Sequence, residues 1–429
     1  MIRRIRSLVA VSLALAASAT FAQQQQGQTP GQTPATPAPT GNAQTPPPGG
    51  PNAQAPAPPI PPSWAQGRRP EQESSTLAPH PPGLTALAAN ELPTSRIKVP
   101  AGFTVSVYAS GAPNARSMTF GKDGTLYVGT RFPGSVYAVS PSGEVKTIAK
   151  GLHRANGVAY KDGTLYVAEL SRIIAFRNID GHLDGAKYDV VFDNLPKDEA
   201  HGWKFMKLGP DGKLYFQIGA PGNIVMPPYT HAQVVRLDPD KKVLETMAYG
   251  VRNSVGMDFH PVTKELWFTN NGRDWVSDDM PNDTLHRVTH KGMNFGYPFC
   301  HQGALLDDEF GKGRSCDEFD KPAYKLGPHV AALGMRFYTG TQFPAEYRNN
   351  IFIAEHGSWN RTKKSGYGVY RVVLDAKGNV TKYEPFATGW LQGDQFWGRP
   401  ADVQVAPDGS LLVSDDVAGA IFRISYKKP

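Results

Sequence analysis

Residues 200–223, AHGWKFMKLGPDGKLYFQIGAPGN, contain the pattern that decides the fold. Two short stretches of alternating apolar residues, 205–208 and 214–218, flank a Gly-Pro-Asp-Gly sequence. A strand, a tight glycine turn and a returning strand are typical of a β-hairpin. Because a hairpin brings its two open ends together, we expect His201 and the loop 219–223 to lie on the same side of the molecule.

The same hairpin recurs along the chain. Its returning strands align as DGTLYVGT at 123–130, DGTLYVAE at 162–169, DGKLYFQI at 211–218, KELWFTNN at 264–271, NNIFIAEH at 349–356 and DGSLLVSD at 408–415. A short strand precedes each of them, and a third strand follows most of them. Repeats of about 40 to 60 residues built from four short strands predict an all-β fold, a six-bladed β-propeller with four-stranded antiparallel blades.

Two segments do not belong to the repeats. The strand-like stretch 97–109 has no unit of its own, and we expect it to supply the outer strand of the last blade and close the ring. An insertion at about 290–335 contains both cysteines, Cys300 and Cys316. A disulfide between them would stabilise the fold by about 3 kcal/mol. A redox pair is the weaker interpretation, because the spacing is not Cys-x-x-Cys.

The N-terminal part of the chain does not resemble a folded domain. Residues 1–22 combine early arginines, an apolar run and small residues before Gln23, which predicts a cleaved signal peptide. The run is too short to span a bilayer, so we expect a periplasmic or secreted protein without a membrane span. Residues 23–92 are rich in Pro, Gln and Thr and are predicted to be a disordered linker. The propeller domain is expected over 93–429.

The net charge excludes one class of partner. The chain carries +7, and three of the positive charges lie in the predicted signal peptide, which leaves +4. That excess is too small to indicate nucleic acid binding, and we find no basic run with interleaved aromatic residues.

The propeller geometry predicts which residues share the mouth of the central channel. If the first strand of each unit is innermost, residues just before it and just after the second strand lie on one rim. The first group is Arg116, Arg154 with Asn156, His201, Arg252 with Asn253, Gly334 and Arg399. The second group is Arg131, Glu169, Gly219, Asn271 with Gly272, His356, and Asp415 with Asp416.

These rim residues have both structural and functional interpretations. A single arginine is most simply a rim salt bridge, but several at equivalent blade positions favour a small polyanion, since guanidinium groups bind carboxylates bidentately. A histidine at a strand start is often structural. Beside arginines at a channel mouth, His201 is a candidate general base.

Two loops contain further candidate residues. The segment 268–288 is rich in Asp and Asn, which is consistent with calcium binding or with ordinary turn chemistry. In HGSWNR, residues 356–361, Trp359 could be a stacking platform with Asn360 and Arg361 as polar clamps, or simply a packed tryptophan.

At these residues the sequence resembles the pyrroloquinoline quinone (PQQ)-dependent soluble sugar dehydrogenases, above all the sorbosone dehydrogenase branch. The resemblance covers about 95–427. It rests on the motifs HGWKFMKLGPDGKLY, YGVRNSVGMDFHP, NNGRD, NFGYP, EHGSWNR and GRPADVQVAPDGSLLVSDD taken together.

The resemblance implies a site. In that family PQQ lies in the channel mouth with a calcium ion at its edge, and His201 matches the base that takes the sugar hydroxyl proton while hydride passes to the quinone. Two successive backbone carbonyls, of Gly272 and Arg273 here, match the calcium ligands. Arg252 with Asn253, and Arg399, match the family's cofactor residues. From the rim and the HGSWNR loop we also assign to the cofactor His356, Asn360, Arg361, Arg116 and Arg131. PQQ is a tricarboxylate, which suits an arginine-lined mouth.

The sequence also departs from the glucose-oxidising members of that family. Ala200 replaces an Asp before the histidine, and Lys204 and Phe205 replace a Gly-Arg pair. Arg273 stands where Pro is usual, and His356 or Arg361 would take the place of the family's cofactor lysine. These differences weaken the case for glucose as substrate more than the case for PQQ.

Three functional hypotheses follow. The first is an exported PQQ-dependent dehydrogenase of a small aldose or aldehyde-bearing sugar; it would need an external electron acceptor, a cytochrome or a quinone, because no haem-attachment motif is present. The second is a calcium-dependent lactonase, with a metal cage drawn from Glu169, Asn253 and Asp415. The third is a binding propeller without chemistry, which does not require a convergent arginine and histidine rim.

Overall fold

The computed structural model describes residues 62–427 and is built almost entirely of β-strands. Within this range every helix is a three-residue 3₁₀ turn: η1 (Ser63–Ala65), η2 (Pro70–Gln72), η3 (Ala89–Glu91), η4 (Thr94–Arg96), η5 (Cys316–Glu318) and η6 (Ala345–Tyr347). The predicted signal peptide and residues 23–61 of the predicted linker lie outside the described residues.

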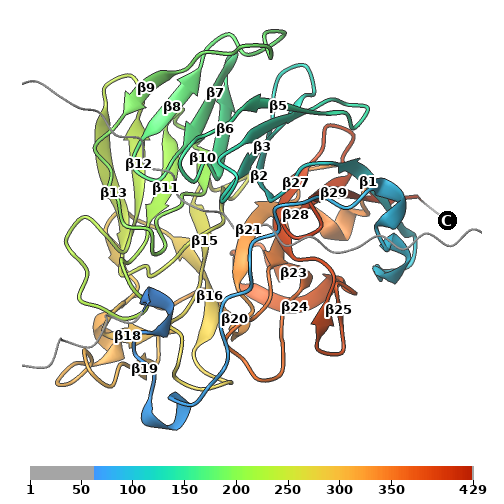
Figure 1. Cartoon of the computed structure of the whole chain (residues 1–429). Coiled ribbons are helices and arrows are strands. Elements are labelled where there is room, and N and C mark those ends of the chain that lie inside the picture. Colours follow the sequence, from blue (N-terminus) through green and yellow to red (C-terminus); the bar gives the residue numbers. More distant parts are fainter. Residues whose placement is uncertain (1–61, 428–429) are drawn as a thin grey trace, which may run out of the picture. The chain divides into compact units, whose positions relative to one another are not determined.

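Six antiparallel sheets form the blades of a propeller, which confirms the predicted fold (Figure 1). From the inner strand outward they are β2 (Ala115–Phe120), β3 (Leu126–Thr130), β4 (Val136–Val139), β5 (Val145–Ala149); β6 (Gly157–Lys161), β7 (Thr164–Ala168), β8 (Ile173–Phe176), β9 (Asp189–Phe192); β10 (Met206–Leu208), β11 (Leu214–Ile218), β12 (Gln233–Asp238), β13 (Val243–Tyr249); β14 (Met257–Phe259), β15 (Leu266–Asn270), β16 (Asn282–Val288), β20 (Tyr324–Pro328); β21 (Ala332–Phe337), β22 (Ile351–Glu355), β23 (Gly368–Leu374), β24 (Val380–Ala387); and β27 (Pro400–Val405), β28 (Leu411–Asp415), β29 (Ala420–Tyr426), β1 (Phe103–Ser110).

The ring is closed by the first strand of the chain, as the sequence predicts. Strand β1 pairs antiparallel with β29, from Phe103 opposite Tyr426 to Ser110 opposite Ala420. The N-terminal strand therefore completes the blade that the C-terminal hairpin begins, and the last blade has no unpaired outer edge at β29.

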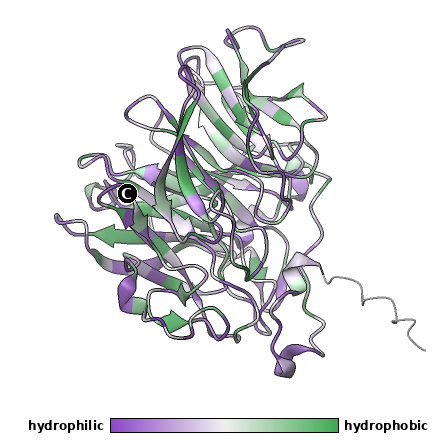
Figure 2. Cartoon of the chain, turned by 90° about the vertical axis from the view of Figure 1, so that its left-hand side faces the viewer, coloured by the Kyte–Doolittle hydropathy of each residue, from purple (hydrophilic) through white to green (hydrophobic). Residues whose placement is uncertain are grey.

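The inner strands surround the channel and approach each other closely. Strands β2, β6, β10, β14, β21 and β27 contact their neighbours around the ring. A Cβ atom on Gly256 would lie 2.0 Å from the Leu333 carbonyl oxygen, and one on Gly334 would lie 2.5 Å from the Asp402 Cα. Glycine is required where adjacent blades meet this tightly. Farther out, buried apolar residues of neighbouring blades form shared clusters. Hydrophobic residues, green in Figure 2, recur along the strands.

The predicted insertion between the fourth and fifth units is present. It adds β17 (Met293–Asn294), parallel to β13, so the third sheet has a fifth strand. A small hairpin follows, β18 (Cys300–His301) and β19 (Leu305–Leu306). Cys300 and Cys316 form a disulfide, which confirms the structural interpretation of the two cysteines. A second small hairpin, β25 (Leu391–Gln392) and β26 (Gln395–Phe396), precedes the last blade.

The prediction of a disordered linker up to residue 92 is wrong for the part that the structure describes. Residues 62–88, here called the N-terminal strap, run across one face of the propeller (blue in Figure 1). The Leu87 amide donates to the Ala418 carbonyl, and the Trp275 indole donates to the Trp64 carbonyl. A Pro- and Gly-rich composition removes regular secondary structure, but it does not prevent such a segment from packing on a preformed surface.

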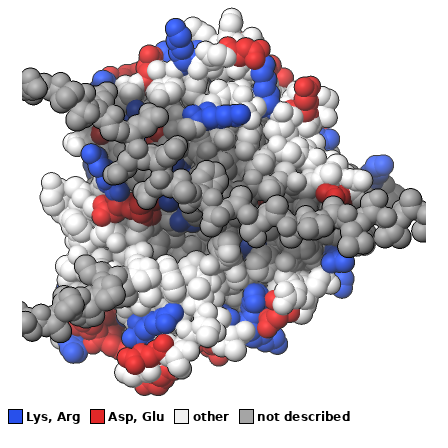
Figure 3. Space-filling model, in the orientation of Figure 1, with Lys and Arg blue, Asp and Glu red and all other residues white. Residues whose placement is uncertain are grey.

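The described surface agrees with the charge analysis. On the face shown in Figure 3, Lys and Arg side chains are interspersed with Asp and Glu side chains outside the area that grey atoms cover. Over residues 62–427, no helix is long and apolar enough to cross a membrane.

Candidate active site

A cavity of about 390 Å³ opens at the channel mouth and contains most of the predicted rim. The rim residues that line it are Arg116, Arg131, Arg154, His201, Arg252, Asn253, Asn271, Gly272, His356, Arg399 and Asp416, joined by Asn360. Strands of all six blades deliver these side chains to one place, as the propeller geometry requires.

Several predicted residues do not reach the cavity. Arg361 lies outside it and pairs with Asp279, with 2.8 Å between Nη2 and Oδ1, so the structure does not bring Arg361 together with the other residues assigned to the cofactor. Arg273 does not line it either, and its guanidinium forms a buried ion pair with Asp307. Gly272 alone of the predicted calcium pair reaches the cavity wall. The remaining predicted rim residues that do not line the cavity are Asn156, Glu169, Gly219, Gly334 and Asp415.

His201 is held in a strained and tightly packed turn before β10. Its φ is +50°, a conformation that costs a non-glycine residue energy and that clusters at functional sites. The facing residue must be glycine, because a Cβ on Gly219 would lie 2.5 Å from the His201 Cβ. The turn before β10 and Gly219, which follows β11, thus fix the position of the imidazole.

The hydrogen bond of His201 determines which ring nitrogen is free. Nδ1 lies 2.8 Å from the Ala220 carbonyl oxygen, which can only accept, so Nδ1 carries the proton and Nε2 has a free lone pair. Burial, together with the positive charges of Arg252 and Arg131, lowers the pKa of His201 well below its usual value. The imidazole is therefore neutral at pH 7 and able to accept a proton.

Three of the five cavity arginines have carboxylate partners, as the salt-bridge interpretation predicts. Arg116 pairs with Asp416 in a buried contact. Arg154 pairs with Glu199 at 2.8 Å, and Arg252 with Asp274 at 2.8 Å.

The other two arginines have no carboxylate partner among residues 62–427. Arg399 is buried and donates to the backbone carbonyls of His356 and Gly357, at 2.9 and 2.7 Å. The Arg131 guanidinium stacks 3.3 Å from the Trp203 ring centroid, and its Nε is covered without a hydrogen-bond partner. Burial and the neighbouring Arg116 and Arg154 lower the pKa of Arg131. Positive charge is thus concentrated where an anionic ligand could offset it.

His356 is coupled to this cationic wall through Asp416. Its Nε2 lies 2.8 Å from Asp416 Oδ1, while the other oxygen of that carboxylate faces Arg116. Burial and Arg399 lower the pKa of His356 to about 3. His356 is therefore neutral, donates to Asp416 and cannot supply the positive charge of the lysine that it was expected to replace.

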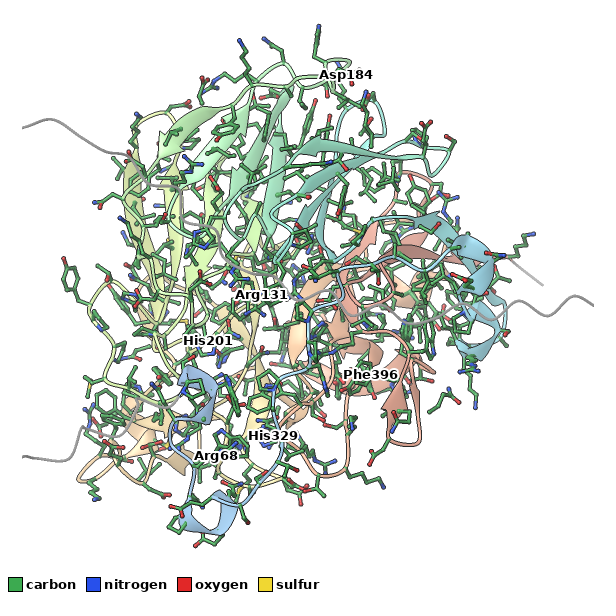
Figure 4. All side chains as sticks on the ribbon, in the orientation of Figure 1. Arg68, Arg131, Asp184, His201, His329 and Phe396 are labelled. Carbon is green, nitrogen blue, oxygen red and sulfur yellow. A yellow bond between two sulfur atoms is a disulfide. The ribbon has the colours of Figure 1, made fainter. Side chains whose placement is uncertain are left out.

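Asp274 and His329 join the site, although the sequence analysis did not single them out. The Asp274 carboxylate accepts from Arg252 and from Asn360, and Asn360 also donates to His329 Nδ1 at 3.1 Å. His329 Nε2 lies 2.7 Å from the Ser277 carbonyl oxygen, so both ring nitrogens are engaged. His329 precedes β21 by three residues, a position that alignment of the first strands could have revealed (Figure 4).

Trp359 lines the cavity as the platform hypothesis predicts. Its ring lies edge-on to Trp275 at 5.6 Å and to Trp64 of the strap at 5.9 Å between centroids. The sequence analysis missed Trp64 because it falls in the segment that was assigned to the linker.

The two carboxylates that the lactonase hypothesis assigns to its metal cage, Glu169 and Asp415, do not line the cavity and have other partners. Glu169 accepts from the His153 amide and pairs with Arg172, and Asp415 accepts from the amides of Val417 and Ala418. Within residues 62–427, no three His, Cys, Asp or Glu side chains converge as metal ligands.

Comparison with known proteins places the chain in a family. A family model described as glucose/sorbosone dehydrogenase matches residues 167–423. An uncharacterized protein of Borreliella burgdorferi is 35% identical over 359 residues, 80% of this chain and 94% of that protein. A pyrroloquinoline quinone-dependent pyranose dehydrogenase of Coprinopsis cinerea is 26% identical over 229 residues, 42% of this chain and 31% of that enzyme.

Solved structures share the fold at low sequence identity. The holo PQQ domain of the Coprinopsis cinerea pyranose dehydrogenase has a TM-score of 0.65 and 19% identity, covering 77% of this chain and 97% of that one. The PQQ-bound aldose sugar dehydrogenase of Streptomyces coelicolor has a TM-score of 0.54 and 18% identity, covering 77% and 100%. With the family model and the Borreliella relative, these observations show that the chain belongs to the glucose/sorbosone dehydrogenase family.

Proposed function

We propose that this protein is an exported, PQQ-dependent dehydrogenase of a small aldose or aldehyde-bearing sugar such as sorbosone. The observation that carries the proposal is one cavity that contains a neutral histidine with a free Nε2 and guanidinium groups without a carboxylate partner among residues 62–427. The family relatives named for PQQ-dependent sugar oxidation support the same chemistry.

The chemistry of the cavity wall fits a planar polycarboxylate. Arg131 and Arg399 have no carboxylate partner in the described structure, so their guanidinium groups can donate to the carboxylates of a ligand. Three polar atoms of lining residues are also buried there without a partner. These atoms are Arg131 Nε, Trp203 Nε1 and Asn253 Oδ1. Two donors and one acceptor, all desolvated, favour a ligand that carries both carboxylates and a donor group.

The chain's own residues would act as follows. PQQ, when bound, supplies a quinone that accepts hydride from the sugar carbon. His201 Nε2 takes the proton of the hydroxyl on that carbon, while the bond from Nδ1 to the Ala220 carbonyl holds the ring in the required tautomer. Burial, together with the positive charge of Arg252, keeps the imidazole unprotonated before it takes the substrate proton. Asp274 and the Asn223 carbonyl hold Arg252 in place.

The proposal includes a calcium ion at the edge of the cofactor. Gly272 lies on the cavity wall with Asn271, Asp274 and Asp283, so the oxygen-rich side of the cavity is where a calcium ion would be held. A bound Ca²⁺ would there stabilise negative charge that develops on the quinone.

Export and the electron acceptor complete the proposal. The disulfide between Cys300 and Cys316 is typical of an oxidising compartment, which agrees with the signal peptide predicted at residues 1–22. Electrons would leave to a separate acceptor, a cytochrome or a quinone, since the sequence has no covalent haem motif.

Reconstitution of the full chain tests the proposal. We would add PQQ with and without Ca²⁺, remove free cofactor by gel filtration, and follow dye reduction with aldoses, sorbosone and simple aldehydes. Retention of the near-ultraviolet absorbance of PQQ together with sugar-dependent dye reduction is the expected result. Loss of all PQQ on the column would overturn the proposal and direct the assay to lactones.

The protonation state of His201 gives a prediction that does not depend on the cofactor. The base must be neutral, and its folded-state pKa lies well below the usual 6.5, so the neutral form is complete at pH 7 and is lost only as pH falls through that lower value. In ligand-free protein labelled with ¹⁵N-histidine, the His201 ring should be neutral with the proton on Nδ1 at pH 6.5. His201→Gln identifies the signal. A ring that titrates at or above pH 6.5 would contradict the prediction.

A further inference from the structure

The N-terminal strap forms part of the cavity wall. Its residues Ser63, Trp64 and 79–83 line the same cavity of about 390 Å³ as His201. In Figure 4 the strap passes upward between the labels of His329 and Phe396. This volume is near the lower end of the usual range for one small-molecule site, so we expect the strap to lie close to a substrate that reaches His201 beside a bound cofactor.

The first crossing of the strap is fixed by several directed contacts. The Trp64 carbonyl accepts from the Trp275 indole at 2.6 Å, and the Gln66 carbonyl accepts from Asn223 at 2.7 Å. The Gly67 carbonyl accepts from the Arg273 guanidinium at 3.0 Å. Arg273, which stands where the family has proline, thus holds the strap instead of lining the cavity.

The second crossing is fixed independently of the first. His80 Nε2 lies 3.1 Å from the Tyr367 hydroxyl, and its ring lies 4.6 Å from the Phe396 ring. A Cβ on Gly83 would lie 2.5 Å from the Asp416 carbonyl oxygen and 2.7 Å from the Val417 Cα. The strap therefore touches the backbone of Asp416, whose carboxylate pairs with Arg116, and a larger side chain at position 83 would lift it.

The chemistry of the first crossing suits a sugar ring. Trp64 and Trp359 both line the cavity and meet edge-to-face at 5.9 Å, so they form a rigid aromatic corner. Aromatic faces pack against the C–H faces of pyranose rings, while the polar wall opposite can bind hydroxyl groups.

We propose that the N-terminal strap is a specificity element of the sugar site: Trp64 packs against the reacting sugar ring, and the strap excludes substrates larger than a monosaccharide. This inference rests on the proposed function. It predicts that opening the strap lowers activity on the monosaccharide and relieves the exclusion of longer saccharides.

The experiment compares full-length variants after PQQ loading. Trp64→Ala removes the aromatic corner, and Gly83→Val forces the second crossing away from Val417. Leu84→Ala is the matched control, because this strap side chain is 57% exposed and does not line the cavity. The measurements are PQQ affinity by absorbance titration, thermal unfolding, and kcat/KM for an aldose and for the disaccharide that ends in it.

Trp64→Ala should lower kcat/KM for the monosaccharide roughly tenfold, the size of one good aromatic contact. Both Trp64→Ala and Gly83→Val should raise the disaccharide-to-monosaccharide ratio of kcat/KM, while Trp64→Ala and Leu84→Ala keep the PQQ affinity of the wild type. If PQQ binds and the ratio does not change in either strap variant, the inference is wrong and the proposed function stands. If the wild type does not retain PQQ, both fall together.

Discussion

Replacing His201 with alanine should reduce kcat for PQQ-dependent sugar oxidation by roughly 10²- to 10⁴-fold, the usual contribution of a general base. The physical reason is that Nε2 is the free nitrogen of a ring held neutral by burial and by two neighbouring arginines. PQQ affinity, measured by absorbance titration, should change little, since the imidazole carries no charge for the cofactor's carboxylates.

His329→Ala is the matched control for this prediction. It removes a second histidine from the same cavity, but one whose two nitrogens are both engaged, by the Ser277 carbonyl and by Asn360. We expect it to retain most of the turnover. If His329→Ala loses as much activity as His201→Ala, or if His201→Ala keeps the wild-type kcat, the assignment of the base is wrong.

Arg131→Met should weaken PQQ binding strongly while leaving the ligand-free protein no less stable. The loss of one desolvated charge-assisted contact typically costs about 2–5 kcal/mol of binding free energy, which is at least a thirtyfold rise in Kd. In the ligand-free protein, however, Arg131 has no carboxylate partner in the described structure and is repelled by Arg116 and Arg154. Removing the charge of Arg131 should therefore leave Tm unchanged or raise it.

Arg116→Met, in contrast to Arg131→Met, should make the ligand-free protein less stable. This side chain is buried and pairs with Asp416, so its removal leaves a buried carboxylate with His356 as its remaining partner. Breaking a buried pair costs about 3–5 kcal/mol, and Tm should fall. Thermal unfolding and absorbance titration of both variants check the pair of predictions. A fall in Tm for Arg131→Met, or an unchanged PQQ affinity, would show that Arg131 is a structural cation.

Much of the fold could be predicted because its information is local and repeated. Each hairpin carries its own alternation and its own glycine turn, as in 205–218, and six copies identify a propeller without any long-range contact. Two further predictions came from the segments that belong to no repeat. They are the closure of the ring by β1 and the disulfide between Cys300 and Cys316, and the structure confirms both.

Which residues line the site could be predicted for the same reason. Which of these residues form ion pairs could not. A position before an inner strand places a residue on the rim, which correctly gathers His201, Arg252 and Arg399. Which arginine meets a carboxylate depends on residues far apart in the sequence, such as Arg116 and Asp416, which are separated by 300 positions. Arg361, assigned to the same site, does not line the cavity, because a loop residue has no blade position that determines its direction.

The sequence by itself determined the blade architecture, the closing strand, the disulfide and the ring of polar residues at the channel mouth. Only the tertiary structure decided which guanidinium groups remain without a partner, which nitrogen of His201 is free, and that residues 62–88 pack over the cavity. The physical reason is that the geometry of each repeat depends on the alternation of apolar and polar residues over a few positions and on its turn residues. Charge pairing and the docking of an aperiodic Pro- and Gly-rich segment depend instead on surfaces that exist only once all six blades have assembled.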